Sequence, residues 1–304
     1  MEKAGPKKKE PLPGQLLQHQ IQQLAHRRRR TAGTSALYQQ WSEFISRRDF
    51  QELVAQERQN RMEDMKRIQW LKPGVAWSLD TTEYGMEKIK ITPLRDLASK
   101  YQVPSPLVQA AEDGTRIAVY LDLMFKKEGP PMFLKRDLGS PLNCRAVDEV
   151  LERHRVLPLN SPPGYPRYNG SMERGMRDLK DALDEQRLQA LMKDVPLALE
   201  VELATHKLNH RRLRSLGGST PCQVYHDPHR RLRLHGAVRD RIFREIFEQF
   251  WQFAQCMPER NRHSLNAGWR LIVEDWLRRQ RWITVRENNQ QKVSTHSKGF
   301  FSQN

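Results

Sequence analysis

Three carboxylates stand at points where the chain changes from one local pattern to another. Asp137 follows the apolar run FLKR and precedes a Gly-Ser-Pro turn, and Glu173 follows a Pro- and Gly-rich segment at the start of a helical pattern. Asp80 closes a stretch in which Trp77 and Leu79 alternate with other residues, the period-two pattern of a strand. Carboxylate oxygens are hard ligands of the kind that Mg²⁺ prefers. We therefore take these three side chains as the candidate catalytic and metal-binding residues.

The order and spacing of these carboxylates resemble those of the DDE family of retroviral-type integrases and insertion-sequence transposases. Thirty-five residues separate the second Asp from the Glu, Trp77 lies three residues before the first Asp, RDLGS surrounds the second, and YNGSMER and DLK flank and include the Glu. The segment NHRRLRSLGGSTPCQVYH at 209–226 looks like the one that closes such cores. The resemblance covers roughly residues 75–226.

The resemblance implies an α/β fold with a ribonuclease H-like core, in which a mixed sheet is flanked by helices. It implies metal-dependent cleavage of DNA 3′ ends, followed by attack of the freed 3′ hydroxyl on target DNA. Two Mg²⁺ ions about 3.5–4 Å apart, for which Mn²⁺ can substitute, would clamp the attacking and leaving oxygens. Asp80 would bridge the ions, while Asp137 and Glu173 would each complete one. The implied partners are the DNA of the element ends, the target DNA and further copies of the chain.

Two alternatives stay open. The family commonly has Asn after the second Asp, where this chain has Leu138. This departure from the family motif favours the first alternative, a catalytically silent, domesticated DNA-binding protein. The other alternative is a ribonuclease H-like nuclease that uses the same ions without strand transfer.

The composition points to a polyanionic partner and to a protein without a membrane span. The 304-residue chain has 52 Lys and Arg against 36 Asp and Glu, a formal net charge of +16 and an isoelectric point near 10.0. An excess of this size favours nucleic acid. No apolar run of about 18 residues predicts a transmembrane helix, and no secretory signal is visible, so we expect an intracellular protein, at the nucleoid or in the cytoplasm of a bacterial-type host. Three scattered cysteines support neither disulfides nor a zinc site.

Residues 1–72 contain many arginines but no group of side chains that suggests catalysis. Residues 1–14 form an expected basic arm, and the helical pattern of 15–72 suggests a helix-turn-helix with Ser46 as a helix cap. The alternative is a plain helical arm with solvated charges. Our candidate DNA-binding residues here are Arg27, Arg28, Arg29, Arg30, Arg47 and Arg48.

Residues 73–227 are the predicted catalytic core, and their pattern alternates strands with helices. We expect a strand at 75–80, a second strand leading to a structural Asp96, a helix at 113–128, a strand ending at Asp137 and a helix at 144–155. The run LPLNSPPGYPRYNG is expected to be an irregular loop because of its prolines and glycines.

The helix that carries Glu173 is expected to have two faces. Met172, Met176, Leu179 and Leu183 follow helical spacing and predict its buried stripe. Arg177 and Lys180 share the adjoining face with Glu173, where they could contact a phosphate backbone. The simpler alternative is a solvated Glu–Arg pair four residues apart.

Residues 228–304 are expected to form a separate carboxyl-terminal module. The stretch at 238–255 predicts an aromatic-rich amphipathic helix. SLNAGWRLIVEDWLRRQ predicts a second helix capped by Ser264, and RWITVRENNQQKVSTHS predicts a hairpin about ENNQ. Two helices and a hairpin could form a winged helix, and an oligomerisation module is the equal alternative.

Overall fold

The computed structural model describes residues 14, 16–18, 20–21, 33–63, 67–137, 139–161, 170–188, 195–257 and 260–286. Its contacts divide the chain into two units, residues 68–284 and a smaller unit of residues 1–67 with 285–304. The domain boundaries expected at 14, 72 and 227 stay predictions.

The smaller unit contains α2 (Thr34–Trp41) and α3 (Arg47–Glu63). Apolar side chains from both helices are buried in one cluster with Leu17 and Ile21. Ser46 caps α3 as predicted, because its hydroxyl accepts the Asp49 amide at 3.2 Å and donates to the Asp49 carboxylate at 2.7 Å. A helix-turn-helix role for this pair stays a prediction.

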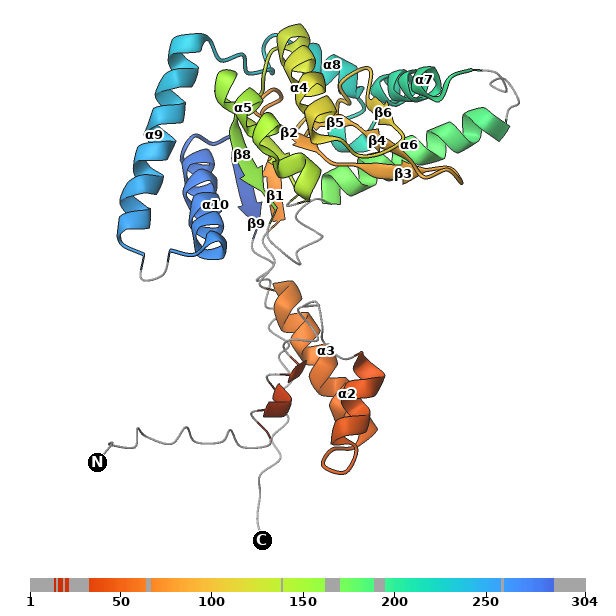
Figure 1. Ribbon diagram of the computed structural model, residues 1–304, viewed down its shortest axis with the longest axis vertical. Coiled ribbons are helices and arrows are strands. Elements are labelled where there is room, and N and C mark those ends of the chain that lie inside the picture. The colour runs from red at the N-terminus through yellow and green to blue at the C-terminus, as the bar shows by residue number, and fades with distance from the viewer. Residues whose placement is uncertain are drawn as a thin grey trace. The chain divides into compact units, whose positions relative to one another are not determined.

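A mixed sheet forms the centre of the larger unit (Figure 1). One piece has the order β5-β2-β7-β8 and the other has the order β3-β4-β6. The strands are β2 (Ala76–Leu79), β3 (Thr82–Tyr84), β4 (Ile89–Thr92), β5 (Leu94–Asp96), β6 (Leu107–Gln109), β7 (Phe133–Arg136) and β8 (Leu157–Asn160).

The two pieces continue one another. Leu79 of β2 lies opposite Leu94 of β5, and Thr82 of β3 lies opposite Ile91 of β4, which is the same antiparallel register on both sides of the break. The hydroxyls of Thr81 and Thr92 bridge the break at 3.0 Å. The sheet therefore has three antiparallel positions, occupied by β6, by β4 with β5, and by β3 with β2. Strand β7 follows, parallel to β2, and β8 follows, parallel to β7. This layout confirms the predicted α/β fold with a mixed sheet.

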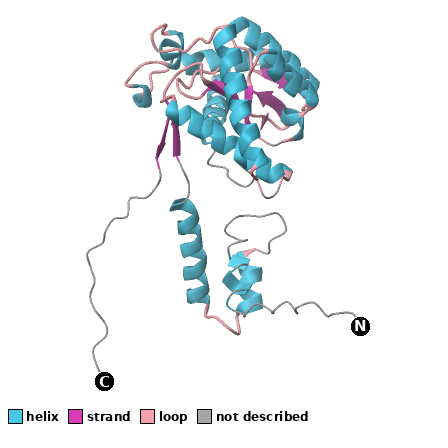
Figure 2. Ribbon diagram, turned by 90° about the vertical axis from the view of Figure 1, so that its left-hand side faces the viewer, coloured by secondary structure: helices cyan, strands magenta, loops and turns pink. Residues whose placement is uncertain are grey.

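Helices cover both faces of the sheet (Figure 2). The helices of this unit are α4 (Gly114–Glu128), α5 (Arg145–Arg153), α6 (Gly170–Leu188), α7 (Leu197–His210), α8 (Pro221–His226), α9 (Gly236–Gln255) and α10 (Arg262–Arg279), with the 3₁₀ turns η1 (Ser140–Asn143) and η3 (Arg214–Leu216). None of the described helices is long and apolar enough to cross a bilayer.

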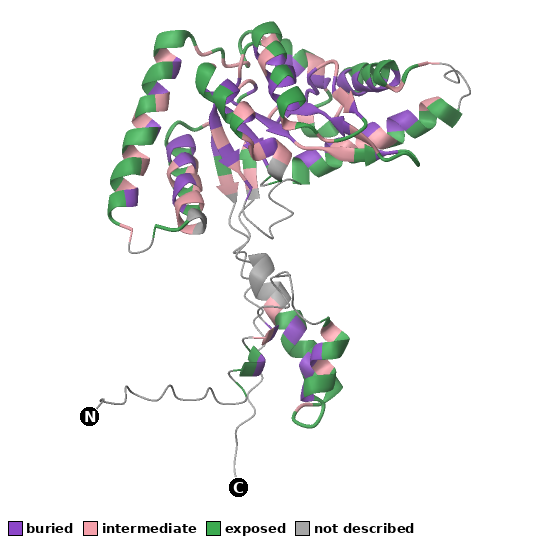
Figure 3. Ribbon diagram, in the orientation of Figure 1, coloured by how far each residue is buried: buried purple, intermediate pink, exposed green. Residues whose placement is uncertain are grey.

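The two faces follow from the alternation of side chains along β7, which is buried throughout. Leu134 packs into the cluster formed with α4 and α5. Phe133 points to the other face, where its ring lies 6.2 Å from that of Trp276 on α10. The strands are accordingly mostly in the buried colour of Figure 3. Burial on both faces is what allows a short parallel strand to hold a fixed position.

Three local expectations were wrong. Residues 157–160, expected to be part of a loop, form β8 at the edge of the sheet. Helix α10 begins at Arg262 and its cap is Asn261, whose side chain accepts the Ser264 amide at 2.9 Å. Residues 67–70, at the end of the stretch 15–72 that was expected to be helical, form strand β1 (Arg67–Trp70), which pairs with β9 (Ile283–Arg286). Strand β9 lies in the first half of the expected hairpin, whose remainder is outside the described residues and stays a prediction.

Candidate active site

Asp80 and Asp137 occupy equivalent places at the carboxyl ends of two adjacent strands. Strands β2 and β7 are parallel, and their register pairs Leu79 with Arg136. The residue that follows each of these partners is an aspartate. Neighbouring strands of a sheet are about 4.8 Å apart, so the two carboxylates are carried to the same edge of the sheet at similar height.

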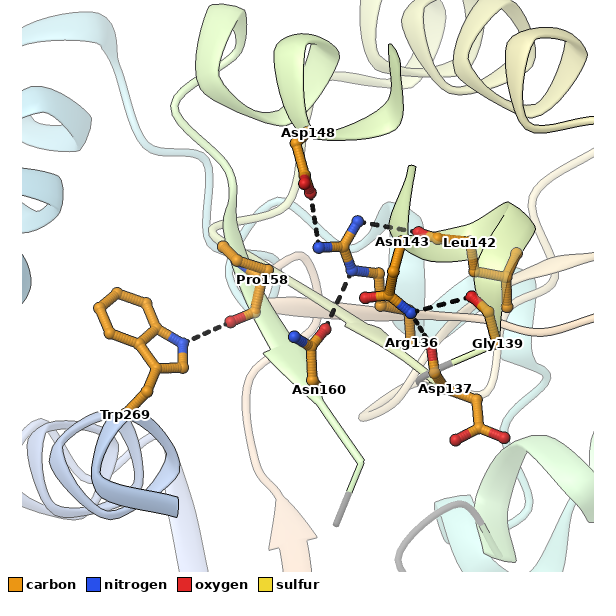
Figure 4. Close-up of polar contacts among 9 residues, drawn as sticks. All are labelled: Arg136, Asp137, Gly139, Leu142, Asn143, Asp148, Pro158, Asn160 and Trp269. Carbon is orange, nitrogen blue, oxygen red and sulfur yellow. Dashed lines mark hydrogen bonds and ion pairs between the residues drawn. The ribbon is translucent and has the colours of Figure 1, made fainter. Parts of the chain in front are cut away.

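Hydrogen bonds from neighbouring elements hold the end of β7 (Figure 4). The Asn143 side chain donates to the Asp137 carbonyl and, at 3.1 Å, to the Gly139 carbonyl. The buried Arg136 guanidinium donates to Asn160 at 3.0 Å, to the Leu142 carbonyl at 2.8 Å and to Asp148 at 2.6 Å. Strand β8, the η1 turn and α5 are thereby tied to the end of β7, so Asp137 is presented from a fixed backbone while its own side chain is exposed.

Glu173 reaches the site from the first turn of α6. The predicted stripe is confirmed, because Met172, Leu179 and Leu183 are buried and Met176 is partly buried. Glu173 is exposed beside this stripe, at the helix end where the dipole favours an anion.

The cations predicted on α6 lie where the spacing puts them. Arg177 is exposed and Lys180 is partly buried. In the described part of the chain, Glu173 and Arg177 form no ion pair with each other. The simple Glu–Arg pair is therefore not what the structure contains, and both groups are available to other partners.

The electrostatics of Asp80 indicate that the three carboxylates share one neighbourhood. Burial and the negative charges of Asp137, Glu173 and Glu112 together raise the pKa of Asp80 to about 6, against a backbone hydrogen bond from Thr81 that lowers it. The influence of Asp137 and Glu173 on Asp80 means that the three carboxylates lie in one region of the molecule.

Lys135 is the only buried lysine among the described residues, and it lies beside this cluster on β7. Burial lowers the pKa of its ammonium group to about 7, while the carboxylates of Glu274 on α10 and Glu173 act in the opposite direction. Sequence reasoning missed Lys135, Glu112 and Asn143. The only sequence signal was a lysine inside an otherwise apolar strand.

The donor set suits a hard divalent cation, although its geometry is open. Within the described ranges, no three His, Cys, Asp or Glu side chains converge closely enough to hold a single ion. Mg²⁺ commonly takes one or two carboxylates from a protein and completes its shell with water and substrate phosphates. Asp80 with Asp137, and Asp80 with Glu173, would meet that requirement without a preformed cage.

Asp96 has the structural role expected of it. It is fully buried on β5 and accepts the Ser99 amide at 2.8 Å, the Ser99 hydroxyl at 2.6 Å and the Gly74 amide at 2.7 Å. Its carboxylate is thus used within the fold and is not available to the site.

The arginines predicted to contact DNA in the smaller unit are only partly described. Arg47 and Arg48 are exposed on α3, and Arg48 forms an ion pair with Glu52 at 3.1 Å. Arg27–Arg30 and the segment 162–169 lie outside the described residues.

The chain matches no protein-family model and no curated protein. Among solved structures it is similar to the HTLV-2 integrase catalytic core domain in complex with magnesium, at 21% identity and a TM-score of 0.43 over 52% of this chain and 100% of that one. It is also similar to the BIV integrase catalytic core, at 22% identity and 0.43 over 50% and 93%. A simian T-cell lymphotropic virus intasome in complex with PP2A regulatory subunit B56 gamma matches at 16% identity and 0.48 over 67% and 74%. Similarities of this size assign neither activity nor substrate to the present chain.

Proposed function

We propose that the chain is a DDE transposase or integrase with a ribonuclease H-like core, which cleaves DNA 3′ ends and joins them to target DNA. The observation that carries this proposal is the pairing of Asp80 and Asp137 at equivalent ends of β2 and β7, with Glu173 close enough to raise the pKa of Asp80. The order of strands, three antiparallel and two parallel, supports the proposed core.

Phosphodiester transfer needs an activated attacking oxygen, a stabilised leaving oxygen and compensation of phosphate charge. A pair of divalent ions supplies all three when bound between such carboxylates. In this chain Asp80 would contact both ions, and Asp137 and Glu173 would contact one each. The hydrogen bonds at the end of β7 and the buried stripe of α6 would hold these ligands in place.

The raised pKa of Asp80 couples cation binding to pH. A ligand must be deprotonated before it can bind a cation, so cation and proton compete for this carboxylate. With a pKa of about 6, Asp80 is mostly ionised above pH 7 and mostly protonated below pH 5. Both cation affinity and activity should therefore fall as the pH is lowered through 6.

The charge of the protein supports DNA as both substrates of the proposed reaction, the element ends and the target. The formal net charge is +16, and Arg177 and Lys180 extend from Glu173 along α6. We assign the recognition of element ends to the amino-terminal helices with Arg47 and Arg48, and we expect more than one copy of the chain to hold the two DNA segments. Binding should weaken steeply with salt because phosphate contacts release counterions.

The proposal is tested by the products formed from labelled DNA. Asp80→Asn, Asp137→Asn and Glu173→Gln should each abolish cation-dependent strand joining and leave DNA binding unchanged. Asp181→Asn removes an exposed carboxylate from the same helix as Glu173 and is the matched control. Joining that survives in any of the three variants would overturn the assignment. Nicking without larger covalent products would instead favour the nuclease.

A further inference from the structure

A basic hollow lies at the opposite edge of the sheet from the candidate active site. It has a volume of about 380 Å³ and is lined by Gly74, the end of α4, and residues 226 and 231–235. Gly74 precedes β2, whereas Asp80 follows it. At about 3.3 Å per residue, the two sites are about 20 Å apart along the strand, so a single phosphate cannot occupy both.

The segment that lines this hollow is firmly attached to the core. The Leu232 amide donates to the Pro73 carbonyl at 2.8 Å, and the Leu232 carbonyl lies so close to Gly74 that a Cβ there would approach it to 2.5 Å. Beyond the segment, the buried Arg239 donates to the Pro131 carbonyl at 2.7 Å. The hollow is therefore preformed by backbone contacts and does not depend on a ligand for its shape.

Its lining has more positive than negative charge. Arg231 stacks on the Tyr225 ring, with its guanidinium carbon 3.9 Å from the centroid, and donates to the Glu128 carbonyl. Lys127 and Arg233 have no hydrogen-bond or ion-pair partner in the described part of the chain. Glu128 contributes the one carboxylate of the lining. Two unpaired cations beside an oriented guanidinium are suited to an anion.

The pKa of His226 depends on the charges around the hollow. Burial lowers the pKa of its imidazole, the cations Arg231 and Arg233 lower it further, and Glu128 acts in the opposite direction. An anion bound in the hollow would offset the two guanidinium charges, so the pKa of His226 would rise.

A second hollow of about 250 Å³ is lined by residues next in sequence to those of the first, among them Lys72, Pro73, His229 and Arg230. Arg230 forms an ion pair with Asp227 at 3.2 Å, so Lys72 is the cation of this lining that has no ion-pair partner among the described residues. Two hollows with cations in their linings, formed by residues adjacent in sequence, suit the successive phosphates of a polymer better than one small anion. Each strand of duplex DNA carries one charge per about 3.4 Å of helix axis.

We propose that the basic hollow binds a backbone phosphate of nucleic acid at a site separate from the carboxylates. The contacts come from Lys127, Arg231 and Arg233, and they are independent of sequence because phosphates carry no base information. The site would hold DNA about 20 Å from the reacting strand. It requires no metal ion and does not depend on the carboxylates being catalytic.

The test uses the full chain in EDTA, with NMR of histidine-labelled protein and His226→Gln to identify the His226 signal. Addition of a short duplex should raise the pKa of His226, and inorganic phosphate at the same phosphate concentration should have a smaller effect. An equal or larger effect of inorganic phosphate would contradict a nucleic-acid ligand and would indicate that the hollow binds a small phosphate compound. No change with either would overturn the proposal.

Salt dependence provides the second measurement. Lys127→Gln with Arg233→Gln should reduce the slope of log Kd against log salt by about two, one for each lost phosphate contact. Lys88→Gln with Arg241→Gln removes the same charge from exposed sites outside the hollow and should leave the slope unchanged. Equal slopes for the two double variants would contradict the proposal. Since EDTA removes divalent cations, neither result depends on the proposed catalysis.

Discussion

Asp80→Asn should stabilise the cation-free protein, and the gain should appear only as the pH rises. In the folded chain Asp80 has a pKa of about 6 instead of 3.8, so the folded state binds more protons than the unfolded state between these values. The free energy of unfolding of the wild type therefore decreases as the pH rises from about 4 to 6. The variant lacks the carboxylate and loses this dependence.

The expected size follows from the difference between the two pKa values. At about 1.4 kcal/mol per pKa unit, the rise from 3.8 to about 6 corresponds to about 3 kcal/mol. The variant should thus gain about 3 kcal/mol over the wild type at pH 8 relative to the same comparison at pH 4. An amide can still accept the Thr81 hydrogen bond of 2.8 Å, and packing differences cancel between the two pH values.

The assay is urea unfolding in EDTA, followed by tryptophan fluorescence. A Trp41→Phe background removes the buried tryptophan of the smaller unit, so that Trp77 and Trp276 report on the sheet. Asp181→Asn, which removes an exposed carboxylate from α6, is the control. If Asp80→Asn shows no pH-dependent gain over Asp181→Asn, the pKa of Asp80 is not raised, and the burial and the carboxylate surroundings described for it are wrong.

Two further predictions concern the same cluster and the helix that completes it. Mg²⁺ at ten times its dissociation constant should stabilise the wild type and Asp181→Asn by about 1.4 kcal/mol and leave Asp137→Asn unchanged, as measured by urea unfolding. Gly175→Ala should destabilise the chain by about 1–3 kcal/mol, because the new Cβ would lie 1.6 Å from a guanidinium nitrogen of Arg95. Arg95→Leu should recover part of this loss in the same assay, and no recovery would mean that the close contact is not its cause.

The elements that carry the candidate site were largely predictable, because they depend on local pattern. Alternating apolar residues end at Asp80, and an apolar run ends at Asp137 before a turn. The helical stripe around Met172 and Leu179 fixed the side of α6 on which Glu173 lies. These features need only the periods of strands and helices, which are independent of distant contacts.

Long-range features could not be predicted in the same way. The four residues of β8 contain a proline and merge into a Pro-rich run, so only their pairing with β7 makes them a strand. Strand β1 lies in a stretch expected to be helical, and its partner β9 comes from the other end of the chain. Trp269 of α10 donates to the Pro158 carbonyl at 2.6 Å, which shows that a carboxyl-terminal helix packs beside the site. No short-range pattern contains this information.

Lys135 illustrates a second limit. From the sequence it is one of many cations in a basic chain, and only burial distinguishes it from the others. Glu274 and Glu173 both act on the pKa of Lys135, and Glu274 can do so because α10 packs against β7. Side chains that act through their surroundings are recognisable only once the surroundings are known.

The measurement that tests the central claim most directly is nicking of supercoiled plasmid by Asp137→Cys in Mg²⁺ and in Mn²⁺ at low salt. A thiolate is a poor ligand for Mg²⁺ and a better one for Mn²⁺. If Asp137 contacts the cation, wild-type protein nicks with both ions, Asp137→Cys nicks only with Mn²⁺, and Asp137→Asn nicks with neither. Equal nicking by Asp137→Cys and the wild type in Mg²⁺, or no nicking by the wild type with either ion, would contradict the proposed centre.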